Sequence, residues 1–299
     1  MVKKSNFLIS VLILLLFVYV LYRYDVFSQI SNMLRDLSYK DIAFSLFIYV
    51  FVYIFRALRL KLYIDEIPLS EMASVIGIHT FFNNIMPFRS GETSFPLILK
   101  KLYGIEITRS SVILFGARIF DLVSLSVLFL LSLFYVSFSD KRLIFFPILA
   151  VLLIVILLFV IYKFLCFFKE RIPFFEKLIV ASAVLFRADK LLLMFLFSIC
   201  IWILKFTAFM FILNAAHLGL GFFKTIFVST FAEFTTILPI HSVGGFGTFE
   251  AGMVGGFSLI GMSAKKALPY AVYFHTLILC MSGFTALSGW IYLSLRRKT

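Results

Sequence analysis

The chain has 299 residues, of which 62% are hydrophobic and only 14% are charged, and its mean hydropathy is +1.07. These values lie far above those of an average soluble domain and predict an integral membrane protein. Lysine and arginine outnumber aspartate and glutamate by 28 to 15, which leaves a net charge of +13. Because the basic residues flank apolar runs, they suit anionic lipid headgroups and cytoplasmic loops, and they argue against a nucleic-acid-binding domain.

The N-terminal segment combines two lysines with an apolar run from Phe7 to Leu21. In length and charge it resembles a signal peptide, but no small-residue cleavage site follows the apolar run. We therefore expect a retained first membrane span over about residues 6–22. The next segment, about 23–41, balances acidic and basic residues and can lie outside the cell.

A second span is predicted over about residues 42–63. Three basic residues, Arg56, Arg59 and Lys61, stand at its end. Because basic residues gather in cytoplasmic loops, this end of the span should face the cytoplasm.

Two short apolar pieces follow, about 69–86 and 94–103, with a break at 87–92 between them. Neither piece has the roughly 20 residues that a helix needs to cross a bilayer. A re-entrant helical hairpin that dips in from the cytoplasm and returns explains both the lengths and the basic residues Lys100 and Lys101 at its end.

The rest of the chain repeats this pattern. Further spans are expected over about 110–137, 143–165, 191–215 and 267–293, with a second interrupted pair of pieces at about 222–238 and 248–262. A basic segment, about 169–190, is expected to lie along the headgroups as a cytoplasmic linker between a first half, about 1–168, and a second half, about 191–299. The predicted fold class is an all-α polytopic membrane protein, a single integral membrane domain with about six transmembrane helices and two re-entrant hairpins.

With both termini in the cytoplasm, the two halves run in opposite directions and form an inverted-topology repeat. The second hairpin then enters from the outer side. Lys265 and Lys266 fit this assignment poorly, since basic residues prefer the cytoplasm. If the second pair of pieces crosses instead of re-entering, the number of spans rises and the symmetry weakens.

The two breaks carry the same order of residue types, with Pro, Ser, Gly and Glu in the stretches Asn83–Thr93 and Leu238–Glu250. Hydrocarbon cannot hydrogen-bond a freed peptide group, so irregular backbone at this depth survives only where protein or a water-filled cavity covers it. Paired breaks, one in each half, indicate the binding site of a transporter.

Ionisable residues stand in and near the first break. Arg89 and Glu92 are three residues apart, as are Arg118 and Asp121, so each pair would share one helix face. Such residues either neutralise one another inside the membrane or surround a polar pathway. The guanidinium of Arg89 suits phosphate, and free N–H groups at a helix start near Thr93 would complete an anion pocket capped by Ser90 and Thr93.

These patterns define the candidate site. We expect the substrate to contact Asn83, Asn84, Arg89, Ser90, Gly91, Thr93, Arg118, Ser242, Gly244, Gly245 and Gly247. Glu92, Asp121, Glu233 and Glu250 are candidates for ion pairing or for coupling to a proton gradient, because a buried carboxylate can exchange protons. Gly252 and Gly256 continue a small-xxx-small pattern, which is also typical of tight helix packing.

Cysteine and histidine spacing gives no sign of a metal or a cofactor, and we expect neither. The three cysteines, Cys166, Cys200 and Cys280, lie in or beside apolar runs and are expected to be buried free thiols. The four histidines are scattered and form no ligand set of known spacing.

At its two breaks the sequence resembles the transmembrane region of the lysylphosphatidylglycerol synthase/flippase family. The resemblance rests on Asn84-x-x-Pro87-x-Arg89-x-Gly91-Glu92, on Arg118-x-x-Asp121 and on Pro239-x-x-Ser242-x-Gly244-Gly245-x-Gly247-x-x-Glu250, and it spans about residues 5–295. It implies movement of anionic or aminoacylated lipids, or of polyprenyl-phosphate carriers, between leaflets. Some relatives add a soluble transferase domain, which this sequence does not show, so the synthase activity is not expected here.

The leading hypothesis is a lipid translocase of the cell membrane that binds the phosphate of a membrane lipid. The alternative is an accessory membrane subunit that presents a lipid carrier to a separate glycosyl- or aminoacyl-transferase. Either can act as a homo-oligomer or with a partner transferase. A membrane enzyme is not expected, since no nucleophile and base or metal ligands are spaced for catalysis.

Overall fold

The structure is a computed structural model, and it describes residues 4–136, 188–237 and 242–296, together with the isolated positions 152, 156 and 163. The side chains of residues 4–10, 88, 89, 188 and 189 are outside this description. Apart from those three positions, the predicted span over 143–165 lies outside the described residues, as does nearly all of the predicted linker over 169–190.

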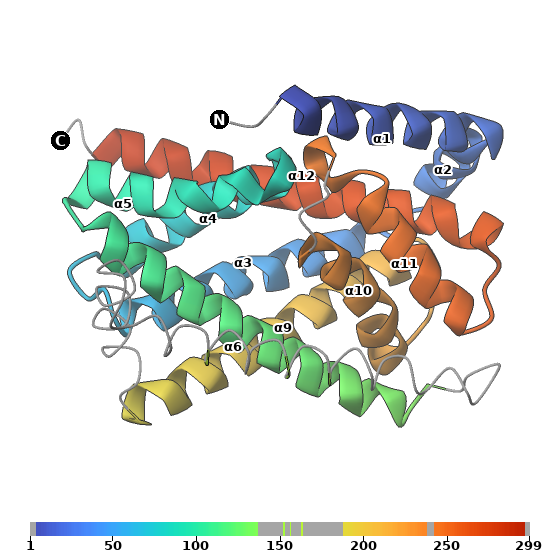
Figure 1. Ribbon diagram of the computed structural model, residues 1–299. Helices are drawn as coiled ribbons and strands as arrows, with labels where there is room; N and C mark the ends of the chain where they lie inside the picture. The colour runs from blue at the N-terminus through green and yellow to red at the C-terminus, as the bar shows by residue number, and fades with distance from the viewer. Residues whose placement is uncertain are drawn as a thin grey trace.

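Every regular element in the described part of the chain is helical, as predicted (Figure 1). The α-helices are α1 (Lys4–Arg23), α2 (Val26–Arg35), α3 (Tyr39–Lys61), α4 (Leu69–Ile85), α5 (Ser94–Tyr103), α6 (Ile107–Leu133), α9 (Ala188–Ala215), α10 (Phe222–Ile237), α11 (Thr248–Leu259) and α12 (Ala264–Arg296). Two 3-10 helices, η1 (Pro87–Thr93) and η3 (Val243–Gly245), occupy the two breaks.

Four of the described helices are long and apolar enough to cross a membrane: α3, α6, α9 from Lys190 onward, and α12. The N-terminal pair α1 and α2 passes the same test only as one bent unit, with an angle of 70° between Val11–Arg23 and Val26–Arg35. The bend occurs at Asp25, whose φ of 52° lies in the left-handed region. The chain is thus a multi-pass membrane protein, with four or five spans in the described residues.

The first interrupted pair folds back on itself. The hydroxyl of Tyr103, the last residue of α5, donates a hydrogen bond of 2.6 Å to Glu71 in the first turn of α4. The same Glu71 pairs with Arg296 at the end of α12, and Arg109 of α6 pairs at 2.6 Å with Glu66 in the loop before α4. The beginning of α4, the end of α5 and the C-terminal end of α12 therefore lie on one side of the molecule (Figure 1).

The second interrupted pair also folds back, and glycines set its packing. A Cβ at Gly256 of α11 would lie 2.9 Å from the Cα of Val228 in α10, and one at Gly252 would lie 3.0 Å from the Cα of Ala232. Residue 228 contacts residue 256, and residue 232 contacts residue 252. The helices α10 and α11 therefore run antiparallel. The small-xxx-small pattern is thus a packing surface, as one of the two interpretations predicted.

The two pairs approach each other from opposite ends of α6. The first pair joins α6 near Arg109, whereas Tyr135, just beyond the end of α6, stacks on Phe223 at the start of α10 with ring centroids 3.8 Å apart. A helix of this length spans roughly 40 Å, so the outer ends of the two pairs are separated by about the thickness of a bilayer. The inner ends meet, since α4 and η1 both contact η3.

The expectation that the cysteines are buried was wrong for two of them. Cys200 and Cys280 are exposed free thiols, on helices that present apolar surface outward, where a bilayer accommodates a thiol as readily as a protein core does. Arg59 lies in the last turn of α3, as predicted, but it is only 3% exposed. It turns into the protein, because a carboxylate of α6 lies within reach.

The glycine contacts give a test of the helix packing. Gly256→Ala should lower stability by about 1–3 kcal/mol, because its methyl group would overlap the backbone of Val228. Gly255→Ala is the matched control, since nothing lies within 4 Å of its Cβ position and alanine favours helix. Thermal melting of the detergent-purified variants measures the stability of each. Equal melting temperatures for the two variants would contradict the assigned packing.

Candidate functional site

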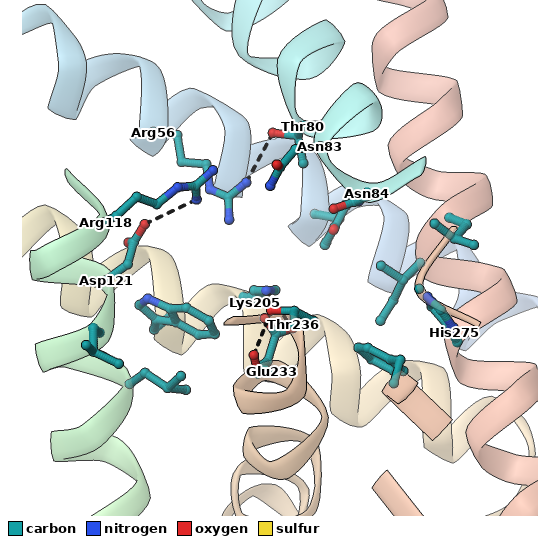
Figure 2. Close-up of a pocket in the computed structure, with 18 of the residues that line it drawn as sticks. Arg56, Thr80, Asn83, Asn84, Arg118, Asp121, Lys205, Glu233, Thr236 and His275 are labelled. Carbon is teal, nitrogen blue, oxygen red and sulfur yellow. Dashed lines mark hydrogen bonds and ion pairs between the residues drawn. The ribbon is translucent and has the colours of Figure 1, made fainter. Parts of the chain in front are cut away.

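A polar cavity of about 300 Å³ lies where the two breaks meet (Figure 2). Its polar lining comes from six helices and consists of Tyr49 and Arg56 of α3, Thr80, Asn83 and Asn84 of α4, Arg118 and Asp121 of α6, Trp202 and Lys205 of α9, Glu233 and Thr236 of α10, and His275 of α12. Gly244 and Gly245 of η3 complete this part of the wall. Because Arg118, Asp121 and Lys205 lie near the middle of their long apolar helices, the cavity is at mid-depth in the helix bundle.

A buried ion pair joins α3 to α6 beside the cavity. Arg59 donates two hydrogen bonds to the carboxylate of Asp121, at 2.6 and 3.2 Å, and a third, at 2.7 Å, to the hydroxyl of Ser198 on α9. A guanidinium binds a carboxylate most strongly in this forked geometry. Asp121 is therefore oriented mainly by Arg59, and its contact with Arg118 is longer, at 3.7 Å.

Arg118 links α6 to the first break. Its guanidinium lies 3.0 Å from the carboxylate of Glu92 in η1 and 3.4 Å from the Nε2 of His79 in α4. The Nδ1 of His79 shares a hydrogen bond of 2.9 Å with the hydroxyl of Ser94 at the start of α5. The two segments of the first pair and the following helix are thus held at one point by charge-assisted contacts.

A third pair crosses the cavity floor between α9 and α10. The ammonium of Lys205 lies 2.7 Å from the carboxylate of Glu233 (Figure 2). It also lies 4.4 Å from the centre of the Trp202 ring. Both charged side chains are largely buried. Removing two charges from water costs several kcal/mol per ion, so such a pair is stable only while both partners are present.

Glu250 has a structural position next to the cavity. Its carboxylate accepts a hydrogen bond of 2.7 Å from the backbone N–H of Gly247 and lies 2.7 Å from the Nδ1 of His275. The His275 ring stacks on Phe249 with a centroid distance of 4.2 Å. Glu250, which is fully buried, therefore fixes the start of α11 and the position of His275, and only His275 reaches the cavity.

Arg56 differs from the other cavity cations, because no carboxylate pairs with it among the described residues. Its strongest polar contact there is a long hydrogen bond of 3.4 Å to the hydroxyl of Thr80. Its Nε is buried and has no hydrogen-bond partner from the described residues, and the same is true of the Nε of Arg118 and the Oδ1 of Asn83. Buried polar atoms in proteins are nearly always satisfied, so these atoms indicate a place for a polar ligand or water.

The structure brings seven of the predicted site residues to the cavity wall. They are Asn83, Asn84, Arg118, Asp121, Glu233, Gly244 and Gly245. Glu92 lies behind the wall on Arg118, and Glu250 lies behind it on His275. The side chain of Arg89 is outside the described part of the chain, as are Pro239 and His241 of the second break.

The helix α5 begins at Ser94 with Thr93 as its N-cap, as predicted, but the predicted capping by Ser90 and Thr93 was wrong. The 3-10 helix η1 runs directly into α5. The hydroxyl of Thr93 donates to the carbonyl of Ser90 at 2.8 Å, and that of Ser90 donates to the carbonyl of Pro87 at 2.9 Å. A serine or threonine hydroxyl in a helical turn lies close to the carbonyl three residues earlier and donates its hydrogen bond there. Neither Ser90 nor Thr93 therefore caps an anion pocket.

Three other predicted contacts shape the breaks and do not line the cavity. Gly91 lets η1 approach α4, since a Cβ there would lie 2.5 Å from the Cα of Asn83. Ser242 donates a hydrogen bond of 2.5 Å to the carbonyl of Phe246 within the second break. Gly247, with a φ of 89°, packs against Phe17 of α1. Each is required by close packing or by backbone conformation.

Several lining residues were missed from sequence. Lys205 is a lone lysine within an apolar run, and the rule that intramembrane charges are functional would have found it. Arg56 was assigned to a cytoplasmic end, because it stands close to Lys61 in sequence. Trp202 and His275 carry no local signal, since their place in the wall depends on contacts between distant helices.

Comparison with known proteins identifies one family. A family model described as "Lysylphosphatidylglycerol synthase TM region" matches residues 7–284, which is most of the chain and agrees with the resemblance seen at the two breaks. No curated protein and no solved structure matches the chain.

The pair on the cavity floor can be tested by a double-mutant cycle. Lys205→Met and Glu233→Leu should each destabilise the protein by about 3–5 kcal/mol, because each leaves a buried charge without its partner. The double variant Lys205→Met/Glu233→Leu should recover most of that loss. Thermal melting in detergent measures all three, and additive losses in the double variant would show that the two side chains do not interact.

Proposed function

The chain belongs to the lysylphosphatidylglycerol synthase transmembrane-region family, whose members are connected with lipid modification or translocation, and on this basis we propose that it is a lipid translocase. Its substrate is an anionic phospholipid, an aminoacylated lipid or a polyprenyl-phosphate carrier, moved between the leaflets of the cell membrane. It carries out this movement without covalent chemistry. Its principal partners are the membrane lipids themselves.

The observation that supports this proposal most directly is the charged cavity at mid-depth between the two breaks. Charged side chains inside a membrane protein are costly and are typical of substrate pathways. Here Arg56 and Arg118 point into one cavity together with Asn83 (Figure 2), and each has a buried polar atom without a partner. A phosphate group satisfies the two guanidinium donors better than water, since guanidinium and phosphate match in charge and geometry. The Oδ1 of Asn83 is an acceptor and takes a hydrogen bond from water or from a hydroxyl of the headgroup.

In this proposal the two interrupted pairs are re-entrant hairpins that enter the bilayer from opposite faces. Their outer ends lie at opposite ends of α6, and their inner ends meet at η1 and η3. The order of α3, first pair and α6 is matched by α9, second pair and α12 in the reverse direction (Figure 1). Such an inverted repeat provides two related ways of opening one central site, which is the usual basis of alternating access.

The cavity wall includes residues that also face the exterior. Phe115 of α6 is 56% exposed and Met86 at the first break is 40% exposed, and both line the cavity. The cavity therefore communicates with the apolar surface of the protein on the side of α4 and α6. A lipid headgroup can enter there while its acyl chains stay in the bilayer, so only the polar part has to be enclosed.

The carboxylates of the site suggest how the cycle is controlled. Glu92 and Asp121 both contact Arg118, and a phosphate that binds Arg118 competes with them. Protonation of Glu233 would release Lys205 as a further phosphate ligand, which couples lipid entry to a proton. Both steps exchange one anionic partner of a cation for another, and Asp121 keeps Arg59 as its partner throughout.

Lipid movement in proteoliposomes tests the function. The protein should move phosphatidylglycerol that is fluorescently labelled on an acyl chain, and Arg56→Gln should slow this movement at least about tenfold, the effect of losing one charge-assisted phosphate contact. Arg35→Gln is the matched control, because Arg35 lies exposed on α2 and does not line the cavity.

Equal rates for the unaltered protein, Arg56→Gln and empty vesicles would contradict the translocase proposal. If the purified protein binds the lipid but does not move it, the result favours the alternative function, an accessory subunit that presents a lipid carrier to a separate transferase. Reconstituted protein is quantified for each variant, so a lower amount of protein is not read as a lower rate.

A further inference from the structure

The charges around the cavity do not balance. Within the described residues, the cations at or directly behind its wall on the side of α3, α6 and α9 are Arg56, Arg59, Arg118 and Lys205, and the carboxylates are Glu92, Asp121 and Glu233. Four cations against three carboxylates leave one positive charge without a counter-ion. The site as it stands is therefore suited to one added negative charge.

The excess charge can be placed on one residue. Each carboxylate has a close cation: Asp121 binds Arg59 at 2.6 Å, Glu92 binds Arg118 at 3.0 Å, and Glu233 binds Lys205 at 2.7 Å. Arg56 remains, and in the described part of the chain its contacts are the hydroxyl of Thr80 at 3.4 Å and the face of the Tyr53 ring at 5.9 Å. A neutral hydroxyl and an aromatic ring do not neutralise a guanidinium.

The remaining pair at the cavity, His275 with Glu250, lies on the side of α11 and α12. Glu250 faces away from the cavity and is held by His275 and by the backbone of Gly247. Its carboxylate is engaged by these two groups, and no ion pair joins it to Arg56 among the described residues. It therefore does not compensate Arg56.

We propose that this cavity selects lipids whose headgroup carries one phosphate and no amine, and that Arg56 is the residue that determines this selectivity. The proposal rests on the translocase function and narrows its substrate. An aminoacylated headgroup would bring an ammonium group into a cavity whose carboxylates are all engaged. To bind it, Asp121 or Glu233 would have to release its present partner and leave that cation buried without a counter-ion, which is strongly unfavourable.

The size of the cavity supports the same class of ligand. Its volume of about 300 Å³ lies at the lower end of the range for small-molecule sites. That volume suits a phosphate with a small alcohol, or a phosphate alone, and is too small for an oligosaccharide. The shared chemistry is a single phosphate ester on a lipid, which either a glycerophospholipid or a polyprenyl phosphate provides.

The protein contains its own reporter for binding. It has two tryptophans, of which Trp202 lines the cavity and Trp290 is 61% exposed on α12. The Nε1 of Trp202 is buried and has no hydrogen-bond partner among the described residues. The ammonium of Lys205 lies over the Trp202 ring. In a Trp290→Phe background, the fluorescence of Trp202 therefore reports changes in charge and hydration inside the cavity.

The test is a titration of this Trp290→Phe protein in nanodiscs of phosphatidylcholine with increasing fractions of one other lipid. Phosphatidylglycerol and a polyprenyl monophosphate form two separate arms, and lysyl-phosphatidylglycerol forms the third. We expect Trp202 to respond to one or both of the first two lipids, and to lysyl-phosphatidylglycerol only at fractions at least about tenfold higher, as expected for one uncompensated charge contact. The first two arms distinguish the phosphodiester from the phosphomonoester source.

Arg56→Gln in the same background should weaken the response to the anionic lipids at least about tenfold and reduce their advantage over the aminoacylated lipid, whereas Arg35→Gln should change neither. Equal or tighter binding of lysyl-phosphatidylglycerol overturns the inference, as does unchanged selectivity in Arg56→Gln. The comparison of the three lipids in the Trp290→Phe protein needs no change at Arg56, so the inference is tested even if that variant does not fold.

The titration separates this inference from the function on which it rests. Selective binding of anionic lipids without movement of lipid between leaflets would contradict the translocase and leave the selectivity in place. Movement of lysyl-phosphatidylglycerol as fast as phosphatidylglycerol would contradict the selectivity and leave the translocase in place.

Discussion

Charged groups that cannot be solvated by hydrocarbon determine how this protein is built. The pairs Arg59 with Asp121, Arg118 with Glu92 and Lys205 with Glu233 each connect two separate elements of the fold. An unpartnered charge at this depth would cost several kcal/mol, so the helices have to assemble in the arrangement that brings the pairs together. The pairs therefore fix both the arrangement of the helices around the cavity and the net charge of its wall.

The interrupted helices follow from the same constraint. A continuous helix presents only side chains to its surroundings, whereas a break at mid-depth exposes backbone groups that need polar partners. Side chains within each break supply such partners, since Ser90 donates to the carbonyl of Pro87 and Ser242 to that of Phe246. Glycine makes the close approaches possible at Gly91 against α4 and at Gly252 and Gly256 against α10. The irregular backbone and the charged side chains thus occupy one shared polar region inside an otherwise apolar bundle.

Hydropathy and the distribution of charge predicted the helical class, the long spans and the positions of both breaks, because these depend on local composition. They also found Arg118, Asp121 and Glu233, since a charge in an apolar run is conspicuous. They misassigned Ser90, because a hydroxyl in a helical turn bonds its own backbone. They missed the role of Arg56, because its lack of a counter-ion depends on which carboxylates are engaged by other cations from distant helices.

The central claim is that water and polar ligands reach a charged cavity at mid-depth between the two breaks, and cysteine accessibility measures it most directly. In a background with Cys166, Cys200 and Cys280 replaced by serine, single substitutions Asn84→Cys and Thr236→Cys are treated in membranes with a small hydrophilic thiol reagent. Both positions should be labelled, while Leu287→Cys, on the exposed apolar face of α12, should not. Unlabelled cysteines at both cavity positions, in folded protein, would contradict the claim.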